Sequence, residues 1–388
     1  MITVEDALAL VFDLVTPLPT EIVPLSRANG RYMPKPAIAN RDQPPFAASA
    51  MDGYAVSGPA SPGSTFTVIG EAGAGHAFNG AIAHGQAIRI FTGAPVPDGS
   101  SRVIIQEDVD AKGNQITLRE KLDTGTNIRP LGQDFRAGSA LPPRLLRPND
   151  IALLAAMNIA DLPVTRRPVV AIIATGDELV MPGEDPRPDQ IIASNSFALK
   201  AMIEDAGGTA RMLPIARDTE AALRTVLEMA KGADLIVTIG GASVGDHDLV
   251  GKVAASMGMD RAFYKIAMRP GKPLMAGRLH GVPMLGLPGN PVSAIVCGHL
   301  FLLPMLRAML GQGSHPPQTQ IALLAVDIAA NGPRAHYMRA RLAADQITPF
   351  DRQDSALLTI LTEANALLIR PIGDSSRQAG DAVTYLPI

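Results

Sequence analysis

The chain has 388 residues, and two or more domains are expected because single hydrophobic cores stop growing at roughly 250–300 residues. Hydrophobic residues make up 47% and charged residues 18%, a balance typical of globular rather than disordered chains. The formal net charge of −3 leaves no basic excess for a nucleic-acid backbone, so no nucleic-acid partner is expected. The one cysteine, Cys297, excludes an intrachain disulfide, and zinc is not expected because neither HExxH nor CxxC occurs.

The N-terminal residues lack the basic and apolar regions of a signal peptide. A helix is predicted to begin at Thr3, whose hydroxyl can cap the free amides together with Asp6. Residues 17–45 are rich in proline, which is typical of an extended connector.

The next part of the chain is predicted to be a small all-β domain. From about residue 64 to residue 129, short β-prone runs alternate with Gly, Pro, Asp and Asn, and residues 112–114 are predicted to form a hairpin turn. Another helix is predicted over residues 151–159.

A βα rhythm follows the boundary at residues 166–168. Apolar runs that suit buried strands alternate with helical patterns, which favours a parallel sheet covered on both sides. The predicted strands are 169–173, 235–239 and 283–287, and the predicted helices are 197–205, 219–230 and 292–310. The last helix is the most membrane-like stretch, but it carries His299, Pro304 and Arg307, so we expect a buried helix, no membrane partner and a cytoplasmic location. After a linker at 311–317 the chain returns to β character.

Three predicted strands end in unusual loops, and ligands of open parallel sheets bind beyond the carboxyl ends of the strands. The first loop, residues 175–178, places the Thr175 hydroxyl, a glycine and the carboxylates of Asp177 and Glu178 at a strand tip. A turn with a helix cap is the alternative interpretation, and the loop alone does not decide between them.

The second loop spans residues 240–248. Its glycines, Gly240, Gly241 and Gly245, allow backbone amides to approach a phosphate closely. Asp246 and Asp248 could hold a hard cation such as Mg²⁺ between protein and phosphate. The alternative is a glycine-rich turn before a solvated acidic helix start, but such a glycine run is costly unless something must come close.

The third loop runs from Pro288 to Ser293. Asn290 suits an N-cap and Pro291 the first helical position. The exposed amides of the first turn and the Ser293 hydroxyl would then form an anion site. Taken alone, a purely structural cap explains this loop better.

Three cations lie between the second and third loops. On a strand, Lys265 and Arg269 would fall on one face, and Lys272 follows across a tight Pro-Gly turn. In a net acidic chain this cluster indicates an anion pocket, with a solvated basic face as the alternative.

One further motif points to a different class of enzyme. Residues 241–245 match the G-x-S-x-G elbow of serine hydrolases, with Ser243 as the nucleophile. No HGGG-type segment lies upstream, and acidic residues crowd the position of the elbow helix, so we do not favour a hydrolase.

Taken together, several short sequence motifs are similar to those of one family. They are Ser49-Ala-Met-Asp52-Gly-Tyr-Ala-Val56, Thr92-Gly-Ala-Pro-Val-Pro97, Gly132-Gln-Asp134, Thr175-Gly-Asp-Glu178-Leu179, residues 240–248, Arg269-Pro-Gly-Lys272-Pro273 and Leu287-Pro-Gly-Asn-Pro-Val-Ser293. Their order and spacing resemble the molybdopterin molybdenumtransferases, including the E domain of gephyrin, over essentially the whole chain. The central α/β part alone is shared with the molybdopterin adenylyltransferases.

The resemblance implies an α/β plus β fold, in which a central doubly wound α/β domain has a parallel or mixed sheet. An elongated N-terminal region, a small β domain and a C-terminal β-barrel-like domain would flank it. The expected domains are 1–45 with 138–165 (elongated N-terminal domain), 46–137 (small β domain), 166–314 (molybdopterin-binding α/β domain) and 315–388 (C-terminal β domain).

The implied activity is insertion of molybdenum from molybdate into adenylylated molybdopterin, with release of AMP and the help of Mg²⁺. The resemblance further implies a homodimer whose active site lies between the α/β domain of one subunit and the β domain of the other. A molybdopterin adenylyltransferase would be a partner that supplies the substrate.

Carried over by position, the resemblance also implies roles for individual residues. Glu178, Asp218 and Asp248 would shape the pterin–nucleotide site, with Glu178 and Asp248 at the metal. Phosphate and molybdate would be held by Lys265, Arg269, Lys272 and Ser293, and the partner subunit would supply Asp52, Thr92, Arg129 and Asp134. Substrate contacts are also expected from Thr175, Gly240, Gly241, Ser243, Gly245, Pro288, Asn290, Pro291, Arg334, Arg339 and Ser355.

The sequence departs from the family pattern at three places. Arg269 stands where lysine is common, Gln133 stands where an acid often precedes Asp134, and residues 334–336 lack a frequent glutamate. Two alternatives stay open: a molybdopterin adenylyltransferase, which would consume ATP without molybdate, and a non-catalytic binding or scaffold protein, which would bind a peptide tightly without its catalytic residues.

Overall fold

The computed structural model describes residues 1–241 and 249–388. Contacts within it define two compact units, Met1–Glu21 with Val164–Ile388 and Ile22–Pro163, which we call unit 1 and unit 2. The predicted site residues Ser243, Gly245 and Asp248 lie outside the described residues.

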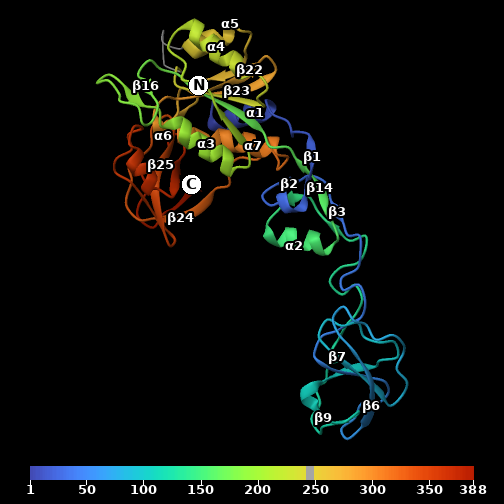
Figure 1. Cartoon of the computed structure of the whole chain (residues 1–388). Coiled ribbons are helices and arrows are strands. Elements are labelled where there is room, and N and C mark those ends of the chain that lie inside the picture. Colours follow the sequence, from blue (N-terminus) through green and yellow to red (C-terminus); the bar gives the residue numbers. More distant parts are fainter. Residues whose placement is uncertain (242–248) are drawn as a thin grey trace. The chain divides into compact units, whose positions relative to one another are not determined.

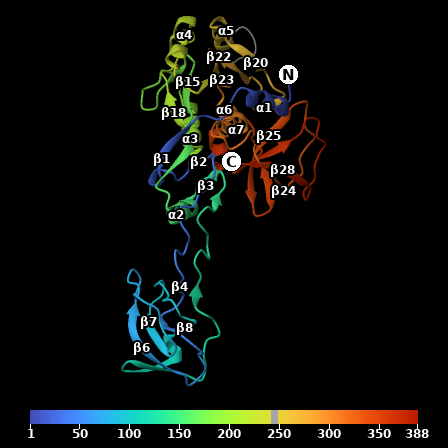
Figure 2. The ribbon, with the colours of Figure 1, turned by 90° about the vertical axis from the view of Figure 1, so that its right-hand side faces the viewer.

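Unit 2 contains a six-stranded sheet, of which β6, β7 and β8 are labelled in Figure 2. The strand order is β8-β5-β7-β6-β10-β9. Its strands are β5 (Gly53–Val56), β6 (Thr65–Ala72), β7 (Gln86–Ile90), β8 (Arg102–Ile105), β9 (Val109–Lys112) and β10 (Gln115–Leu118). Separate apolar clusters, one around Ile88 and Ile90 and one around Phe66 and Ile116, fill its interior. Lys112 pairs with Gln115, which confirms the predicted hairpin turn.

The rest of unit 2 is built from short strand pairs and a helix. The antiparallel pairs are β2 (Tyr32–Met33) with β13 (Arg144–Leu145), β3 (Ala37–Ile38) with β12 (Ala140–Leu141), and β4 (Ala48–Ser49) with β11 (Ile128–Arg129). The other elements are η1 (Leu25–Arg27), η2 (Gln106–Asp108) and α2 (Pro148–Ala156), with β1 (Thr20–Pro24) paired to β14 (Asp161–Thr165) at the unit boundary. Helix α2 begins and ends three residues earlier than predicted, because Pro148 occupies its first turn.

Unit 1 is organised around a six-stranded mixed sheet, of which β22 and β23 are labelled in Figure 1. The strand order is β18-β15-β19-β23-β22-β20. The first four strands in that order are parallel, β22 runs antiparallel to β23, and β20 runs antiparallel to β22. The strands are β15 (Val169–Ala174), β18 (Thr209–Met212), β19 (Leu235–Ile239), β20 (Asp260–Tyr264), β22 (Met275–Leu279) and β23 (Val282–Leu287). All five residues of β19 are buried, as expected for a central parallel strand.

Helices cover both faces of this sheet. One apolar cluster joins the sheet to α1 (Val4–Asp13), α3 (Asn195–Asp205), α6 (Pro291–Cys297) and α7 (Leu303–Met309). The other cluster joins the opposite side chains of the strands to α4 (Glu220–Met229) and α5 (Leu249–Ser256). Helix α1 has the predicted capping box of Thr3 and Asp6, and by its contacts it belongs to unit 1.

The predicted apolar helix 292–310 is a helical stretch from Pro291 to Met309 in which α6 and α7 are joined by a π-helical segment, η3 (Gly298–Leu302). Among the described residues it is the stretch long and apolar enough to cross a membrane, but 78% of it is buried inside the structure. Its position in the core therefore supports the prediction of a buried helix.

The C-terminal part of unit 1 is a closed β-barrel. Strand β25 pairs with both β26 and β27, which closes the order β25-β26-β24-β28-β27 on itself. The elements are β24 (Gln320–Leu324), β25 (Ala335–Ala343), β26 (Gln346–Pro349), α8 (Leu358–Glu363), β27 (Ala366–Arg370) and β28 (Ala382–Pro387). The barrel and the mixed sheet confirm the predicted α/β plus β fold class.

The structure corrects one prediction about the basic cluster. Strand β20 ends at Tyr264, and Lys265 has a φ of +67°, so Lys265 and Arg269 do not share the face of one strand. Arg269 instead lies in β21 (Met268–Arg269), which pairs with barrel strand β25. A positive φ at a lysine is uncommon, and no sequence signal announces it.

Candidate functional site

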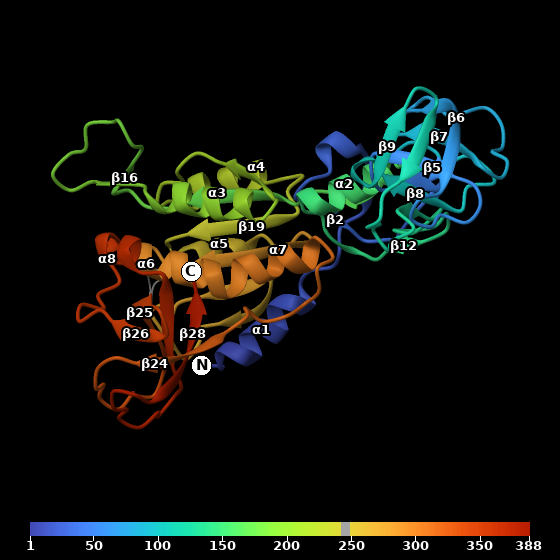
Figure 3. The same cartoon turned by 90° about the horizontal axis from the view of Figure 1, so that it is seen from below.

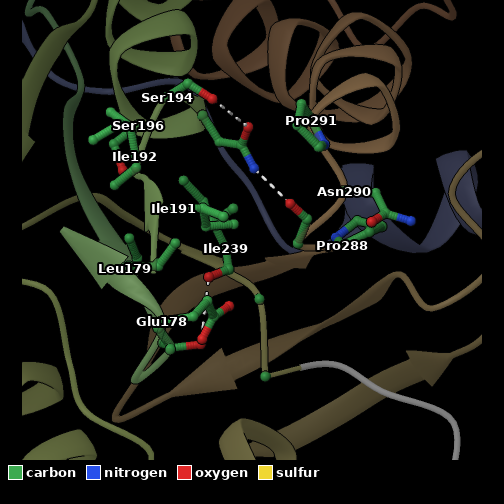
Figure 4. Close-up of a pocket in the computed structure, with 18 of the residues that line it drawn as sticks. Glu178, Leu179, Ile191, Ile192, Ser194, Ser196, Ile239, Pro288, Asn290 and Pro291 are labelled. Atoms are coloured by element: carbon green, nitrogen blue, oxygen red, sulfur yellow. Dashed lines mark hydrogen bonds between the residues drawn. The ribbon is translucent and has the colours of Figure 1, made fainter. Parts of the chain in front are cut away.

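A pocket of about 690 Å³ lies in unit 1 at the carboxyl ends of β15, β19 and β23 (Figure 4). Ligands of open α/β sheets bind at this edge. Eight predicted site residues line it: Thr175, Glu178, Asp218, Gly240, Gly241, Pro288, Asn290 and Pro291.

The first wall of the pocket is the loop after β15. Thr175 is buried, and its amide donates a 2.9 Å hydrogen bond to the carbonyl of Ile239 on the next strand. The Glu178 carboxylate folds back over Gly176, where a Cβ would displace it, and the φ of +150° at Gly176 is one that side-chain-bearing residues rarely adopt. The amide of Asp218 donates to the Asp177 carboxylate at 3.1 Å, which brings a further carboxylate to the pocket rim.

Consecutive glycines after β19 form the floor of the pocket. Gly240 and Gly241 have φ angles of +88° and +63°, which side-chain-bearing residues rarely adopt. A Cβ at Gly240 would lie 2.7 Å from the carbonyl oxygen of Thr175, closer than real contacts allow. Glycine here keeps the strand tips in contact and leaves the backbone accessible to a ligand.

The third predicted loop follows β23 and is tied to the barrel. Asn290 is the N-cap of α6 by backbone conformation, but its side-chain amide donates to the Ser355 hydroxyl at 3.0 Å rather than capping the helix. The amide of Val292 donates to the Ser355 carbonyl at 3.0 Å. The prediction of exposed first-turn amides is therefore wrong for Val292, and Ser293 is buried in the core.

Part of the pocket wall was missed by the sequence analysis. The arm between β16 (Leu179–Val180) and β17 (Ile191–Ile192) projects from the α/β part (Figure 3). Ile191, Ile192 and Ser194 line the pocket (Figure 4). The side-chain amide of Asn195 donates to the carbonyl of Gly289 at 2.7 Å. Ser194 and Asn195, two polar residues directly before the helix predicted at 197–205, were the sequence feature that could have indicated this part of the pocket.

Several arginines gather around His336 of the barrel. Arg269 and Arg370 are the register partners of His336 on β21 and β27. Burial and, as smaller contributions, the positive charges of Arg269, Arg370, Arg339 and Arg334 together lower the pKa of His336 to about 4. The structure thus places the predicted residues Arg269, Arg334 and Arg339 in one cationic region around His336.

Arg339 is the most buried of these arginines, with 1% of its surface exposed. Its guanidinium nitrogens donate to the carbonyls of Leu357 and Arg352, each at 3.2 Å. These contacts hold the segment that carries Ser355, so Arg339 positions this segment.

Lys265 and Lys272 are half-buried, and the Lys265 ammonium lies 4.5 Å from the ring centroid of Tyr264.

Unit 2 carries the four remaining predicted residues. The Asp52 carboxylate accepts hydrogen bonds from the amide and the hydroxyl of Thr92, at 2.7 and 2.8 Å. These bonds hold the pKa of Asp52 below its usual value. Next to it, a Cβ at Gly53 would collide with the Ile104 carbonyl, which explains why glycine follows Asp52 between paired strands.

Arg129 and Asp134 line a separate pocket of about 600 Å³ within unit 2. Gly93, the neighbour of Thr92, lines the same pocket. A guanidinium and a carboxylate on one rim can bind a polar ligand in a fixed orientation.

The donor set of the unit 1 pocket suits magnesium. Among the described residues, no three His, Cys, Asp or Glu side chains are grouped so that they could hold a metal ion by themselves. The side chains of Glu178 and Asp218 do line the same cavity. Mg²⁺ keeps several waters and is commonly held by one or two carboxylates together with substrate phosphates. The residues present therefore fit this ion.

Comparisons with known proteins match the chain from end to end. Three family models match it, described as the MoeA N-terminal region (domains I and II) over residues 2–158, a "probable molybdopterin binding domain" over 171–308 and the MoeA C-terminal region (domain IV) over 322–388. The molybdopterin molybdenumtransferase of Nostoc sp. is 34% identical over 100% of this chain and 94% of the relative. The chain belongs to the molybdopterin molybdenumtransferase family.

Other relatives are consistent with this assignment. Molybdopterin molybdenumtransferase 2 of Mycobacterium tuberculosis is 35% identical over 90% of each chain. The crystal structure of a molybdopterin biosynthesis MoeA protein from Pyrococcus horikoshii has a TM-score of 0.85 at 27% identity and covers 100% of both chains. The family membership confirms the resemblance inferred from the motifs.

Proposed function

We propose that the chain inserts molybdenum from molybdate into adenylylated molybdopterin and releases AMP. Its family membership supports the transferase activity and a molybdopterin-related substrate. The observation that carries the proposal is the pocket at the strand tips of unit 1, where glycine backbone and acidic side chains line one cavity of suitable size.

The chemistry of the substrate explains the composition of this pocket. A phosphoanhydride needs close approach of backbone groups, which Gly240 and Gly241 allow. When its bond breaks, negative charge develops on the departing phosphate oxygens, and fixed dipoles and cations stabilise that charge. Bound Mg²⁺ would neutralise phosphate charge there, held by Glu178 and by Asp248, with Asp218 on the same rim.

The basic residues suit the second substrate. Molybdate is a dianion, so it needs cations without a neighbouring base. Arg269, Arg334 and the lysines Lys265 and Lys272 are the cations that we assign to it, with Ser355 placed by Arg339 and Asn290.

We further propose a cytoplasmic homodimer in which the partner copy supplies Asp52, Thr92, Arg129 and Asp134. Asp52 and Thr92 form a preorganised pair, and Arg129 and Asp134 share a rim. Such exposed polar groups suit a surface that completes the site of another subunit. A molybdopterin adenylyltransferase is the partner that we expect to supply the adenylylated substrate.

The proposal is tested by AMP release from adenylylated molybdopterin in the presence of Mg²⁺, with and without molybdate. We expect molybdate-dependent release by the wild type and a strong loss in Asp248→Asn and Asp218→Asn. ATP consumption without any need for molybdate would favour the adenylyltransferase alternative instead. Bound substrate without any release would favour a carrier or scaffold.

A further inference from the structure

A cavity of about 440 Å³ lies in unit 1 between the helical stretch 291–309, the linker after it and the last barrel strand. Its polar lining residues are His299, Arg307, Gln312, His315, Gln318 and Gln320. None of its lining residues belongs to the strand-tip pocket.

One face of the helical stretch forms a wall of this cavity. His299, Leu303 and Arg307 recur at steps of four residues, so they lie above one another on the same face. His299 is part of the π-helical segment η3, a local geometry that is frequent at functional sites. Opposite them, the His315 ring lies over Gly313, where a Cβ would come within 2.6 Å of its Nε2 atom.

The cavity contains positive charge without a counter-charge. None of its lining residues is Asp or Glu. Within the described part of the chain, the Arg307 guanidinium has no hydrogen bond and no ion pair, and burial lowers the pKa of Arg307 without an acidic neighbour to offset it. Arg370, by contrast, is held by the Asp374 carboxylate at 2.6 Å.

Burial also keeps His299 neutral. Its pKa lies at about 4, so at neutral pH its ring offers one N–H donor and one acceptor. A guanidinium fork beside a neutral imidazole and amide side chains is a donor set for a tetrahedral oxyanion.

We propose that this cavity binds a phosphate group, with Arg307 as its main ligand and His299 and His315 as further donors. The ligand is either free phosphate or a small phosphomonoester, since both present the same dianionic group. The site is independent of the proposed transferase reaction, because none of its residues lines the strand-tip pocket.

Histidine ring resonances of labelled protein provide the test, since the chain has only seven histidines. Inorganic phosphate is titrated at constant ionic strength, with chloride as the balancing anion. We expect the ring signals of His299 and His315 to shift with saturation, while those of His76 and His84 in unit 2 stay in place. A parallel titration with glycerol phosphate distinguishes the two possible ligands. If glycerol phosphate binds more tightly than inorganic phosphate, the natural ligand is a phosphomonoester, and if it does not, the natural ligand is free phosphate.

Substitutions separate this site from other cationic regions. Arg307→Met should weaken the phosphate response of His299 by roughly tenfold or more, and Arg307→Lys should weaken it less, because one charged hydrogen bond remains. Arg278→Met, on strand β22, is the matched control and should leave the response unchanged. Arg334→Met removes a cation of the barrel cluster and should also preserve it.

An absence of saturable shifts at His299 and His315, or an equal response in Arg307→Met, would overturn the proposal. Arg307 would then serve only to offset the negative end of α7, in whose last turn it lies. Circular dichroism of each variant shows whether the fold is intact, and Arg307→Lys keeps the test decisive where Arg307→Met does not fold.

Discussion

The side-chain amide of Asn290 donates a 3.0 Å hydrogen bond to the hydroxyl of Ser355. The two residues are 65 positions apart, and their contact joins the start of α6 to the segment that precedes α8. The amide of Val292 adds a hydrogen bond to the Ser355 carbonyl. The barrel therefore fixes the third loop of the strand-tip pocket.

The first prediction concerns this contact. In a double-mutant cycle, Asn290→Ala and Ser355→Ala should show a coupling of about 0.5 kcal/mol in the free energy of unfolding, because they remove one exposed hydrogen bond. Urea denaturation measures the free energy of unfolding of the wild type, the two single variants and the double variant. Strict additivity of the two single effects would mean that the bond does not contribute in solution.

The second prediction concerns Arg339. Replacing it by leucine leaves the carbonyls of Leu357 and Arg352 without their donor and should cost about 2–4 kcal/mol of stability. The Val292 amide should also lose protection from hydrogen exchange, because its hydrogen bond to the Ser355 carbonyl depends on the position of that segment. Arg341→Leu, at an exposed position of the same strand β25, is the control and should change neither quantity. Unaltered protection of Val292 in Arg339→Leu would contradict the positioning role.

The third prediction concerns the pH dependence of stability. His336 and His299 have folded-state pKa values of about 4, below the usual 6.5. Between pH 6.5 and 4, these two histidines therefore take up protons in the unfolded chain but not in the folded chain. Their contribution to the free energy of unfolding is fully present above pH 6.5 and is lost as the pH falls towards 4. For His336 the loss should be on the order of 1–3 kcal/mol.

Denaturation curves of the wild type and His336→Gln at a series of pH values measure this effect. The variant should show a shallower decline between pH 6.5 and 4, because one of the two histidines no longer takes up a proton on unfolding. Parallel declines in both proteins would show that His336 titrates normally in the folded state.

The fourth prediction concerns Asp52. Removing the Thr92 hydroxyl by Thr92→Val should raise the pKa of the Asp52 carboxyl towards its usual value, because one of two hydrogen bonds to the charged form is lost. Carbon NMR of labelled aspartate measures the titration. Thr117→Val, on strand β10, should leave the Asp52 titration unchanged. A pKa that does not move in Thr92→Val would show that the bond is absent in solution.

The sequence was sufficient for much of the α/β part. Strand β19 spans the predicted residues 235–239, because a five-residue apolar run that ends at glycines is short enough for a buried strand and too short for a helix. The loops after β15, β19 and β23 were also predicted to lie at one edge, since the carboxyl ends of parallel strands meet there.

The remaining features depend on long-range contacts that leave no local pattern. Nothing near Asn290 indicates that its side chain bonds to Ser355 instead of the helix, because that choice depends on a barrel segment far along the chain. The break at Lys265 is likewise imposed by neighbouring elements, since its amide donates to Leu274 and the following strand joins the barrel. The resemblance supplied Asp218, Arg129 and Asp134, which residue patterns alone did not single out.

The most direct test of the central claim follows molybdenum itself. Molybdate, Mg²⁺, adenylylated molybdopterin and the chain are incubated together, and the product is measured by its ability to activate a cofactor-free molybdoenzyme. Wild type and the control Glu228→Gln, at an exposed position of α4, should both generate active cofactor. Glu178→Gln should reduce the rate by roughly tenfold or more, because it removes a carboxylate from the strand-tip pocket. Release of AMP without any active cofactor, or full activity in Glu178→Gln, would contradict the account.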